Sequence, residues 1–142
     1  MKKIYFLIRV LFIYLFFTSS GYVSKLNFFD EGKILFDKSQ FEKSKVFFEK
    51  DIVFNPRSEK SYLYLAKIFN KDNNDEEEEI NLENVLLLNP KNDEAIYMLT
   101  LLKIKQSDYK VAKELIEKFT LICESFCSKK IEMENKLNKL TP

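Results

Sequence analysis

The chain has 142 residues, enough for one domain, and its 23 basic and 22 acidic residues leave a net charge of only +1. This balance excludes the overall basic field that is typical of nucleic-acid-binding proteins. The sequence contains no His or Trp, two Gly and three Pro residues. Because helix-breaking residues are rare and the apolar residues recur at three- and four-residue steps, we expect an all-α protein.

The start of the chain has the composition of a targeting segment. Lys2 and Lys3 give the chain a basic start. An apolar stretch interrupted only by Arg9 follows, and residues 18–21 have small side chains. This order is typical of a bacterial signal peptide, and we expect residues 1–21 to be one, cleaved near Tyr22. The protein would then be periplasmic or otherwise extracytoplasmic. Loss of the leader removes three of the 23 bases, and the remaining 20 bases against 22 acids give a net charge of −2.

The alternative for this segment is an uncleaved anchor in the inner membrane. Residues 4–23 are long enough to cross a bilayer as a helix. Arg9 would lie inside that span, at a cost of about 2.5–3.5 kcal/mol on insertion scales. We therefore prefer the cleaved signal peptide, and we expect any contact with a membrane to be made only by this segment.

Two similar segments divide the rest of the chain. Residues 54–59 read Phe-Asn-Pro-Arg-Ser-Glu and residues 88–93 read Leu-Asn-Pro-Lys-Asn-Asp, with Pro56 and Pro90 34 residues apart. Proline cannot continue a helix, and the Ser or Asp that follows can cap the next one. A fixed period of this length is typical of stacked helical repeats.

These prolines set the phase of three units, residues 25–58, 59–92 and 93–126. Each unit is expected to form two helices joined by a short turn. The expected pairs are Leu26–Lys38 with Phe41–Phe54, Ser61–Asn70 with Asp75–Leu88, and Asp93–Lys105 with Tyr109–Cys123. Residues 127–142 are expected to hold a seventh helix, Ser128–Leu140, that caps the last repeat.

Residues at fixed repeat positions carry a resemblance to a known family. Small residues recur where two helices would cross closely, and large residues follow in the second helices: Gly32, Ala66 and Thr100; Ser44 and Ala112; Phe48, Leu82 and Ile116. Over residues 25–126 this pattern, with its Asn-Pro joints, resembles the tetratricopeptide repeat (TPR) family. The resemblance implies an α-solenoid of about three helix-turn-helix repeats plus a capping helix, after the N-terminal signal peptide or anchor helix.

Three residues depart from the TPR pattern. Glu31 replaces a Leu, Glu124 replaces a third proline, and Glu78 takes a position that should be small and buried. A buried carboxylate without a partner costs several kcal/mol. We therefore expect the helix at residues 75–88 to be rotated, or shifted by one residue, so that Glu78 avoids the core.

No group of residues predicts catalysis, a cofactor or a metal site. The sequence has no His, no Gly-rich phosphate loop and no nucleophile motif. The acidic run Asp72–Glu79 contains oxygen ligands that calcium would accept, but it lacks the glycine and the spacing of an EF-hand loop. We interpret this run as a turn followed by a helix N-terminus, where the helix dipole favours negative charge.

The two cysteines, Cys123 and Cys127, lie at the junction of the third repeat and the capping helix. In an oxidising compartment they could form a disulfide, for which a helix break near Glu124–Ser125 would give suitable geometry. The alternative is a pair of inert buried thiols. The spacing does not decide between the two.

The TPR resemblance also implies a ligand-binding surface. First helices of TPR repeats line a concave groove, and the matching positions here are Phe29, Lys33, Phe36, Lys60, Leu63, Lys67, Asn70, Lys71, Glu94, Tyr97, Leu101 and Lys105. Lysines thus surround an apolar, partly aromatic floor, which would suit an acidic or C-terminal segment of a protein. The Asn residues that hold a peptide carboxylate in chaperone-binding TPR domains have no counterpart at Lys33. The alternative is an ordinary solvated helix face.

These observations predict a non-catalytic protein–protein interaction module rather than an enzyme. We expect it to bind a peptide or protein segment in the groove, as an envelope adaptor or assembly factor, and not to bind nucleic acid. The alternative is a membrane-tethered structural subunit docked permanently in a larger complex. An accessory subunit of an enzyme is a third reading that fold alone does not exclude.

Overall fold

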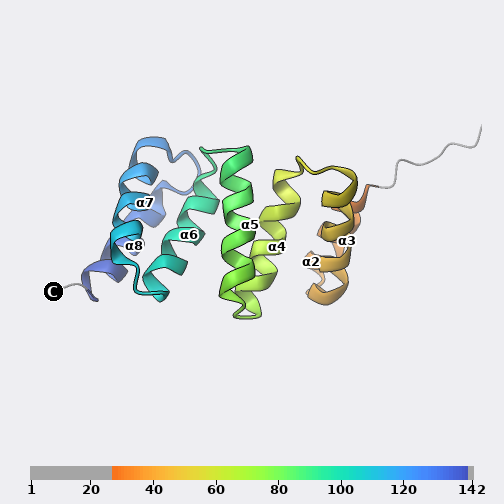
Figure 1. Ribbon diagram of the computed structural model, residues 1–142, viewed down its shortest axis with the longest axis horizontal. Coiled ribbons are helices and arrows are strands. Elements are labelled where there is room, and N and C mark those ends of the chain that lie inside the picture. Colours follow the sequence, from red (N-terminus) through yellow and green to blue (C-terminus); the bar gives the residue numbers. More distant parts are fainter. Residues whose placement is uncertain (1–26, 141–142) are drawn as a thin grey trace, which may run out of the picture.

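The computed structural model describes residues 27–140 of the chain (Figure 1). Within that range it consists of helices and turns: α2 Phe28–Asp37, α3 Phe41–Phe54, α4 Glu59–Lys71, α5 Asp75–Leu88, α6 Asp93–Lys105, α7 Tyr109–Ile122, the 3-10 turn η1 Cys127–Lys129, and α8 Lys130–Asn138. The expected leader at 1–21 and the alternative anchor at 4–23 lie outside the described residues. None of the helices within 27–140 is long and apolar enough to span a membrane.

The helix pairs follow one another along the long axis of the molecule (Figure 1). Each first helix packs against its own second helix, as in α2 with α3, α4 with α5 and α6 with α7, and successive pairs contact one another. At the C-terminal end α8 packs against both α6 and α7. The expected all-α solenoid with a capping helix is confirmed for this part of the chain.

The turn inside each helix pair repeats at the same 34-residue interval. Ser39, Asn73 and Ser107 all adopt a left-handed backbone conformation, with φ of 58°, 54° and 63°. After each of them, the next residue donates its N–H to a carbonyl in the last turn of the first helix, for example Gln40 to Leu35 at 2.9 Å. This is the Schellman arrangement that ends a helix and satisfies its last carbonyls. The three turns are therefore structurally equivalent.

The small residues lie where the helices of a pair approach most closely. Gly32, Ala66 and Thr100 are all buried. A Cβ atom at Gly32 would lie only 2.8 Å from the Phe48 ring. The Ser44 hydroxyl crosses the same contact and donates to the Gly32 carbonyl at 2.8 Å. Only a small side chain fits between α2 and α3 at this position.

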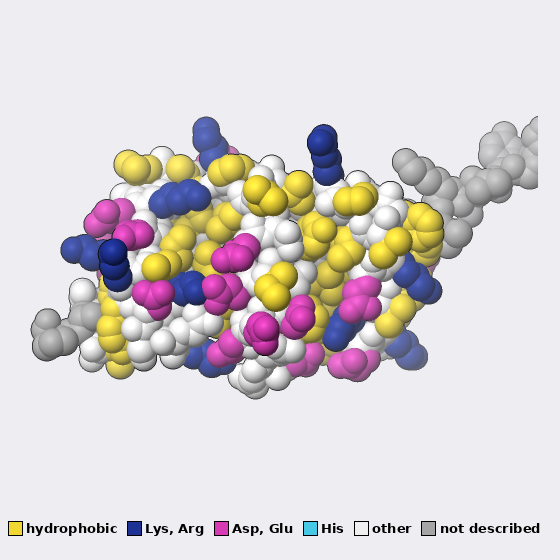
Figure 2. Space-filling model, in the orientation of Figure 1, with side chains coloured by type: hydrophobic (Ala, Val, Ile, Leu, Met, Phe, Trp, Pro, Cys, Tyr) yellow, Lys and Arg dark blue, Asp and Glu magenta, His cyan; other side chains and the backbone are white. Residues whose placement is uncertain are grey.

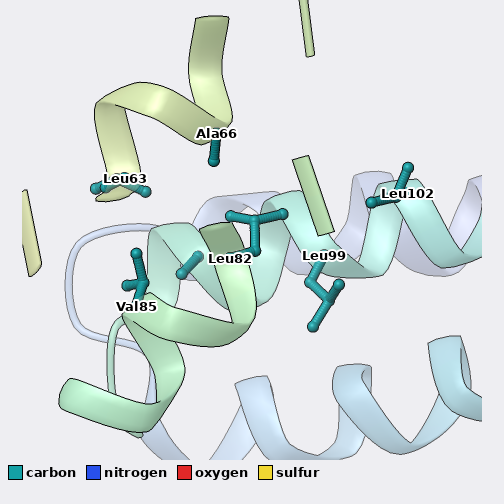
Figure 3. Packing of buried hydrophobic residues seen from close by; sticks show 7 residues of the cluster. Leu63, Ala66, Leu82, Val85, Leu99 and Leu102 are labelled. Carbon is teal, nitrogen blue, oxygen red and sulfur yellow. The ribbon is translucent and has the colours of Figure 1, made fainter. Parts of the chain in front are cut away.

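The core is a chain of clusters between neighbouring helices rather than one central mass. Figure 3 shows Leu63 and Ala66 of α4 facing Leu82 and Val85 of α5, with Leu99 and Leu102 of α6 completing the cluster. A second cluster joins α6 and α7 to Met133 and Leu137 of α8. A third, rich in Phe and Tyr, joins the first repeat to α4. Each repeat thus buries apolar area mainly against its neighbours, as solenoids do.

An acidic residue at the start of a first helix accepts hydrogen bonds from the junction that follows the same helix pair. Glu59 accepts hydrogen bonds from the side chains of Asn89 and Asn92, at 3.0 and 2.6 Å. Asp93, 34 residues later, accepts three backbone N–H groups, from Glu124, Ser125 and Phe126, at 2.9, 2.7 and 2.9 Å. A proline at 124 would lack one of these donors. With Glu instead of proline at position 124, the C-terminal joint is held by three backbone hydrogen bonds to Asp93.

The expected displacement of the helix at residues 75–88 is wrong. α5 runs from Asp75 to Leu88 without a shift, and Glu78 is buried, with only 1% of its surface exposed. The Asn70 amide nitrogen lies 3.0 Å from each Glu78 carboxylate oxygen. Because the carboxylate has a polar partner, the helix does not need to turn it away from the core.

A disulfide joins Cys123 and Cys127 across the C-terminal junction, with a Cα–Cα distance of 5.2 Å. α7 ends at Ile122 and η1 begins at Cys127, so the segment between the cysteines is not helical. The break at residues 123–126 brings the two Cα atoms into disulfide range. The bond closes the same short loop whose N–H groups bind Asp93.

Candidate functional site

Tyr64 on α4 is the centre of an aromatic cluster between the first two repeats. Its ring lies 5.7 Å from Phe29 and 4.9 Å from Phe36, both on α2, measured between ring centroids, and 5.1 Å from the buried Phe48 of α3. The Phe29 and Phe36 contacts are edge-to-face, an arrangement that stabilises aromatic pairs beyond their buried area. The first helices of two repeats are thus joined by aromatic rings.

Three lysines surround these rings. The Lys67 ammonium lies 4.8 Å from the centroid of Tyr64, Lys33 lies 5.8 Å from the same ring, and Lys60 lies 5.8 Å from the ring of Phe29. These distances are within the range of cation–π attraction. We call Phe29, Lys33, Phe36, Lys60, Tyr64 and Lys67 the aromatic–lysine cluster.

Two carboxylates balance part of this positive charge. Asp37 lies 2.5 Å from the Lys33 ammonium, and its hydrogen bond raises the pKa of Lys33 above the ordinary value. Glu94 of α6 lies 2.8 Å from Lys67. Lys60 makes no ion pair within the described residues and is exposed. The cluster therefore keeps a net positive charge, with Lys60 as its most available cation.

The cluster continues toward the turn between α2 and α3. Phe36 is in edge-to-face contact with Phe41 at 5.2 Å, and the Lys71 ammonium lies 4.8 Å from the Phe41 ring. Lys71, like Lys60, is exposed and has no ion-pair partner in the part of the chain that the structure describes. Phe41 and Lys71 thus extend the same alternation of rings and cations.

A cavity of about 360 Å³ adjoins the cluster at the joint between the first two repeats. Phe29 and Lys60 line it together with residues of the Asn-Pro joint. A second cavity, of about 300 Å³, occupies the equivalent joint one repeat later and is lined by Asn89, Asp93 and Glu94 among others. Lys60 in the first cavity corresponds to Glu94 in the second, so the two differ in charge.

Two of the expected groove residues lie elsewhere. Leu63 is buried in the α4–α5–α6 core because it faces Leu82 and Val85 (Figure 3). Asn70 points to Glu78. Lys105, the counterpart of Lys71 one repeat later, is exposed and pairs with Asp75 at 2.5 Å.

The capping segment contacts the expected groove residues of the third repeat. The Tyr97 hydroxyl donates to Glu132 of α8 at 3.0 Å, and the Lys129 ammonium lies 5.4 Å from the Tyr97 ring. Hydrogen bonds from Lys129, Lys136 and Tyr97 lower the pKa of Glu132 to about 2. Leu101 is half-buried against the cluster that includes α8. Of the expected residues, the phenylalanines and lysines of the first two repeats therefore form the open part of the surface.

Sequence reasoning missed Tyr64, although a signal for it was present. Lys60, Tyr64, Lys67 and Lys71 follow one another at steps of four, three and four residues. Such spacing places them on one stripe of a helix. The expected groove residues came from TPR positions, which selected Leu63 instead of its neighbour.

Comparison with known proteins gives no match to a family model and no match among curated proteins. Solved structures do match. The TPR2B domain of yeast Sti1 in complex with an Hsp70 peptide aligns with a TM-score of 0.71 at 17% identity, covering 78% of this chain and 92% of that one. The first TPR domain of Spaghetti (RPAP3), bound to the HSP90 peptide SRMEEVD, aligns with a TM-score of 0.73 at 13% identity, covering 82% and 93%.

The TPR domain of Arabidopsis OM64 is similar to the same extent, with a TM-score of 0.72 at 18% identity over 80% of this chain and 93% of that chain. The stacking of each helix pair on its neighbours, described above, is the general arrangement of solenoid proteins. This chain has the fold of a tetratricopeptide repeat domain.

Proposed function

We propose that this chain is a protein–protein interaction module that binds an extended segment of another protein against the aromatic–lysine cluster. The observation that carries the proposal is the packing of three lysines around the rings of Phe29, Phe36 and Tyr64 on α2 and α4. Two of the similar structures are complexes of TPR domains with Hsp70 or HSP90 peptides. They support peptide binding as the use of this fold here.

The chemistry of the cluster favours an acidic segment or a C-terminal carboxylate. Lysine supplies a positive charge on a flexible stem without the fixed two-pronged geometry of arginine. Aromatic faces beside it can take apolar side chains of the same segment. Lys33 and Lys67 already form ion pairs with Asp37 and Glu94. A ligand carboxylate would therefore meet least competition at Lys60 and Lys71. We infer modest affinity and broad sequence tolerance.

For the cellular role, we propose an adaptor or assembly factor in a bacterial envelope. The support is the composition of residues 1–21, which is that of a signal peptide. The alternative role, a membrane-tethered structural subunit, would follow from an uncleaved segment at 4–23. Mass spectrometry of the N-terminus of the protein isolated from its own cells distinguishes a cleaved from a retained leader.

Selection of peptides from a random library tests the binding proposal with no assumption about the identity of the partner. The library is screened against the full chain and, in parallel, against Lys33→Glu/Lys60→Glu/Lys67→Glu. A matched control carries the same charge change at exposed lysines outside the cluster, Lys43→Glu/Lys110→Glu/Lys139→Glu. Circular dichroism confirms that each variant remains helical.

We expect acidic peptides to be enriched by the wild type and by the control, and to be lost with the cluster variant. A carboxylate at the peptide C-terminus is tested by amidation of the selected peptides. If the three proteins enrich the same peptides, or if none is enriched by the wild type, the proposal is wrong.

A further inference from the structure

The second helices carry exposed apolar residues at one fixed repeat position. Val53, Leu87 and Leu121 lie in the last turns of α3, α5 and α7, 34 residues apart, and they are 74%, 79% and 86% exposed. Isolated exposed apolar residues are normal on protein surfaces. Three of them at the same position of successive repeats form an ordered row.

A second set lies on the same face. Val46 and Ile80 precede Val53 and Leu87 by seven residues, two helical turns, and are nearly half exposed. We call Val46, Val53, Ile80, Leu87 and Leu121 the outer apolar row. Figure 2 shows hydrophobic side chains spaced along the upper edge of the molecule. Exposed apolar side chains rimmed by polar residues mark interaction surfaces when they are covered together, and we take this row as a candidate for one.

Glutamates accompany the outer apolar row in a fixed register. A Glu stands four residues, about one helical turn, before every member of the row: Glu42, Glu49, Glu76, Glu83 and Glu117. All five are exposed, and none has an ion-pair partner among the described residues. Residues four apart lie side by side on a helix. The face therefore presents each apolar side chain next to an unpaired carboxylate.

The negative charge is strongest in the middle of this face. The sequence of α5, DEEEEINLENVLLL, contains acids and no base. Acidic side chains gather over α5 in Figure 2. The neighbouring helices carry some bases as well, Lys43 and Lys50 on α3 and Lys110 and Lys118 on α7. On α5 itself Asp75 and Glu79 pair with Lys105 and Lys103 of α6, whereas Glu76 and Glu83 beside the apolar row have no ion-pair partner among the described residues.

This charge pattern selects among the possible occupants. An anionic membrane would be repelled by the glutamates. A second copy related by a twofold axis would bring α5 against α5, with like charges opposed. A segment with apolar residues flanked by Lys or Arg would satisfy both the apolar row and the glutamates.

We propose that the outer apolar row and its glutamates form a docking surface for a basic amphipathic helix of a partner protein. This surface lies on the second helices, whereas the aromatic–lysine cluster lies on the first helices α2 and α4. The two surfaces have opposite charge and share no residue, so they select different partner segments. The inference does not depend on the function proposed for the aromatic–lysine cluster.

A model peptide tests the proposal directly. The probe is a fluorescein-labelled amphipathic peptide of about 18 residues, made of Leu and Lys at helical spacing, and its partner probe has Glu in place of Lys. Each is titrated with the full chain, and binding is followed by fluorescence anisotropy. The charge variant is Glu76→Lys/Glu83→Lys, and the apolar variant is Val53→Ser/Leu87→Ser/Leu121→Ser. The matched control, Glu31→Lys/Glu124→Lys, makes the same charge change at exposed residues outside α3, α5 and α7.

We expect the basic peptide to bind and the acidic peptide not to bind. Each of the two face variants should weaken binding about tenfold, because each removes several exposed contacts of modest strength, while the control leaves it unchanged. Equal binding to all variants, binding of the acidic peptide, or no binding of the basic peptide would overturn the proposal. Two other results would also overturn it: adsorption of the chain to phosphatidylglycerol vesicles, or dimerisation measured by sedimentation, provided that the apolar variant abolishes the adsorption or the dimerisation. The variants change exposed residues, and circular dichroism checks that they stay folded.

Discussion

The Asn70 side chain on α4 donates its amide to both carboxylate oxygens of the buried Glu78 on α5, each at 3.0 Å. This pair occupies the place where the TPR pattern has a small apolar contact between the helices of a repeat. It explains how α5 keeps its register with a carboxylate in the core. It also makes the stability of the second repeat dependent on pH.

Glu78→Gln should stabilise the protein at neutral pH relative to the wild type. Burial raises the pKa of Glu78, and the hydrogen bonds from Asn70 offset only part of that effect. Because the folded state holds the proton more tightly than the unfolded state, wild-type stability falls as pH rises from about 4.5 through the raised pKa. The difference between the two proteins should grow by about 1.4 kcal/mol for each unit of pKa elevation.

Urea unfolding at a series of pH values measures this difference. Well below pH 4.5 the two proteins should have nearly equal stability, because Glu78 is then protonated in both the folded and the unfolded wild type. Glu76→Gln, an exposed change on the same helix, is the control. A difference that is constant with pH, or that shrinks as pH rises, would contradict this account.

Asp93→Ala should destabilise the junction between the third repeat and the cap. Burial alone would raise the pKa of Asp93, but the N–H groups of Phe126, Glu124 and Ser125 together lower it below the ordinary value. The site is largely solvated, so we expect a loss of about 1 kcal/mol rather than the larger cost of a buried site. The lowered pKa means that this contribution is present above pH 3.8 and is lost as pH falls through the folded-state pKa.

The measurement is again urea unfolding, here at pH 7 and near pH 2.5. Glu117→Ala provides the comparison with an exposed carboxylate that has no ion-pair partner among the described residues. An equal effect of the two substitutions at pH 7 would show that Asp93 does not fasten the loop.

Gly32→Ala should lower stability although alanine favours helices. The new Cβ would lie 2.8 Å from the Phe48 ring, which is fully buried. Overpacking of this kind costs about 1–3 kcal/mol, whereas the gain in helix propensity is about 1 kcal/mol. Combining Gly32→Ala with Phe48→Leu should cost less than the sum of the two single changes. Additive effects in that double-mutant cycle would mean that the two residues do not touch.

Cys123→Ser/Cys127→Ser should loosen the cap more than the rest of the solenoid. The disulfide closes a short loop, for which the chain-entropy model gives about 2 kcal/mol. Amide hydrogen exchange should accelerate in α8, including Met133, and stay unchanged in α2 and α3. Uniform acceleration along the whole chain would instead indicate that the cap and the first repeat unfold together.

The fold was predictable because its signals are local. The Asn-Pro joints and the residues that precede the turns at Ser39, Asn73 and Ser107 set the helix ends within a few residues. The register of α5 was misjudged because the cost of burying Glu78 was considered without its partner, Asn70, on the preceding helix. The cost of burying Glu78 can be estimated from the sequence, but the position of a hydrogen-bond donor on the preceding helix cannot.

The candidate site was predicted less completely. Lys33, Lys60 and Lys67 do come together, yet the ring that Lys33 and Lys67 share is Tyr64, which family positions did not select. The contact of the cap with Tyr97 depends on how α8 packs against α6, a long-range contact that no local pattern encodes. The outer apolar row became visible only when exposure was known, because Val53, Leu87 and Leu121 read in sequence as ordinary core residues.

Site-specific photo-crosslinking in the native cell tests the central claim most directly. A photoreactive amino acid at position 33 lies beside Tyr64, whereas one at position 139 lies on the exposed C-terminal end of the described chain. We predict a discrete crosslinked protein from position 33 that disappears when Lys60 and Lys67 are changed to Glu, and none from position 139. The same crosslink with intact and changed lysines, or crosslinks from position 139 alone, would contradict a binding surface built on the aromatic–lysine cluster.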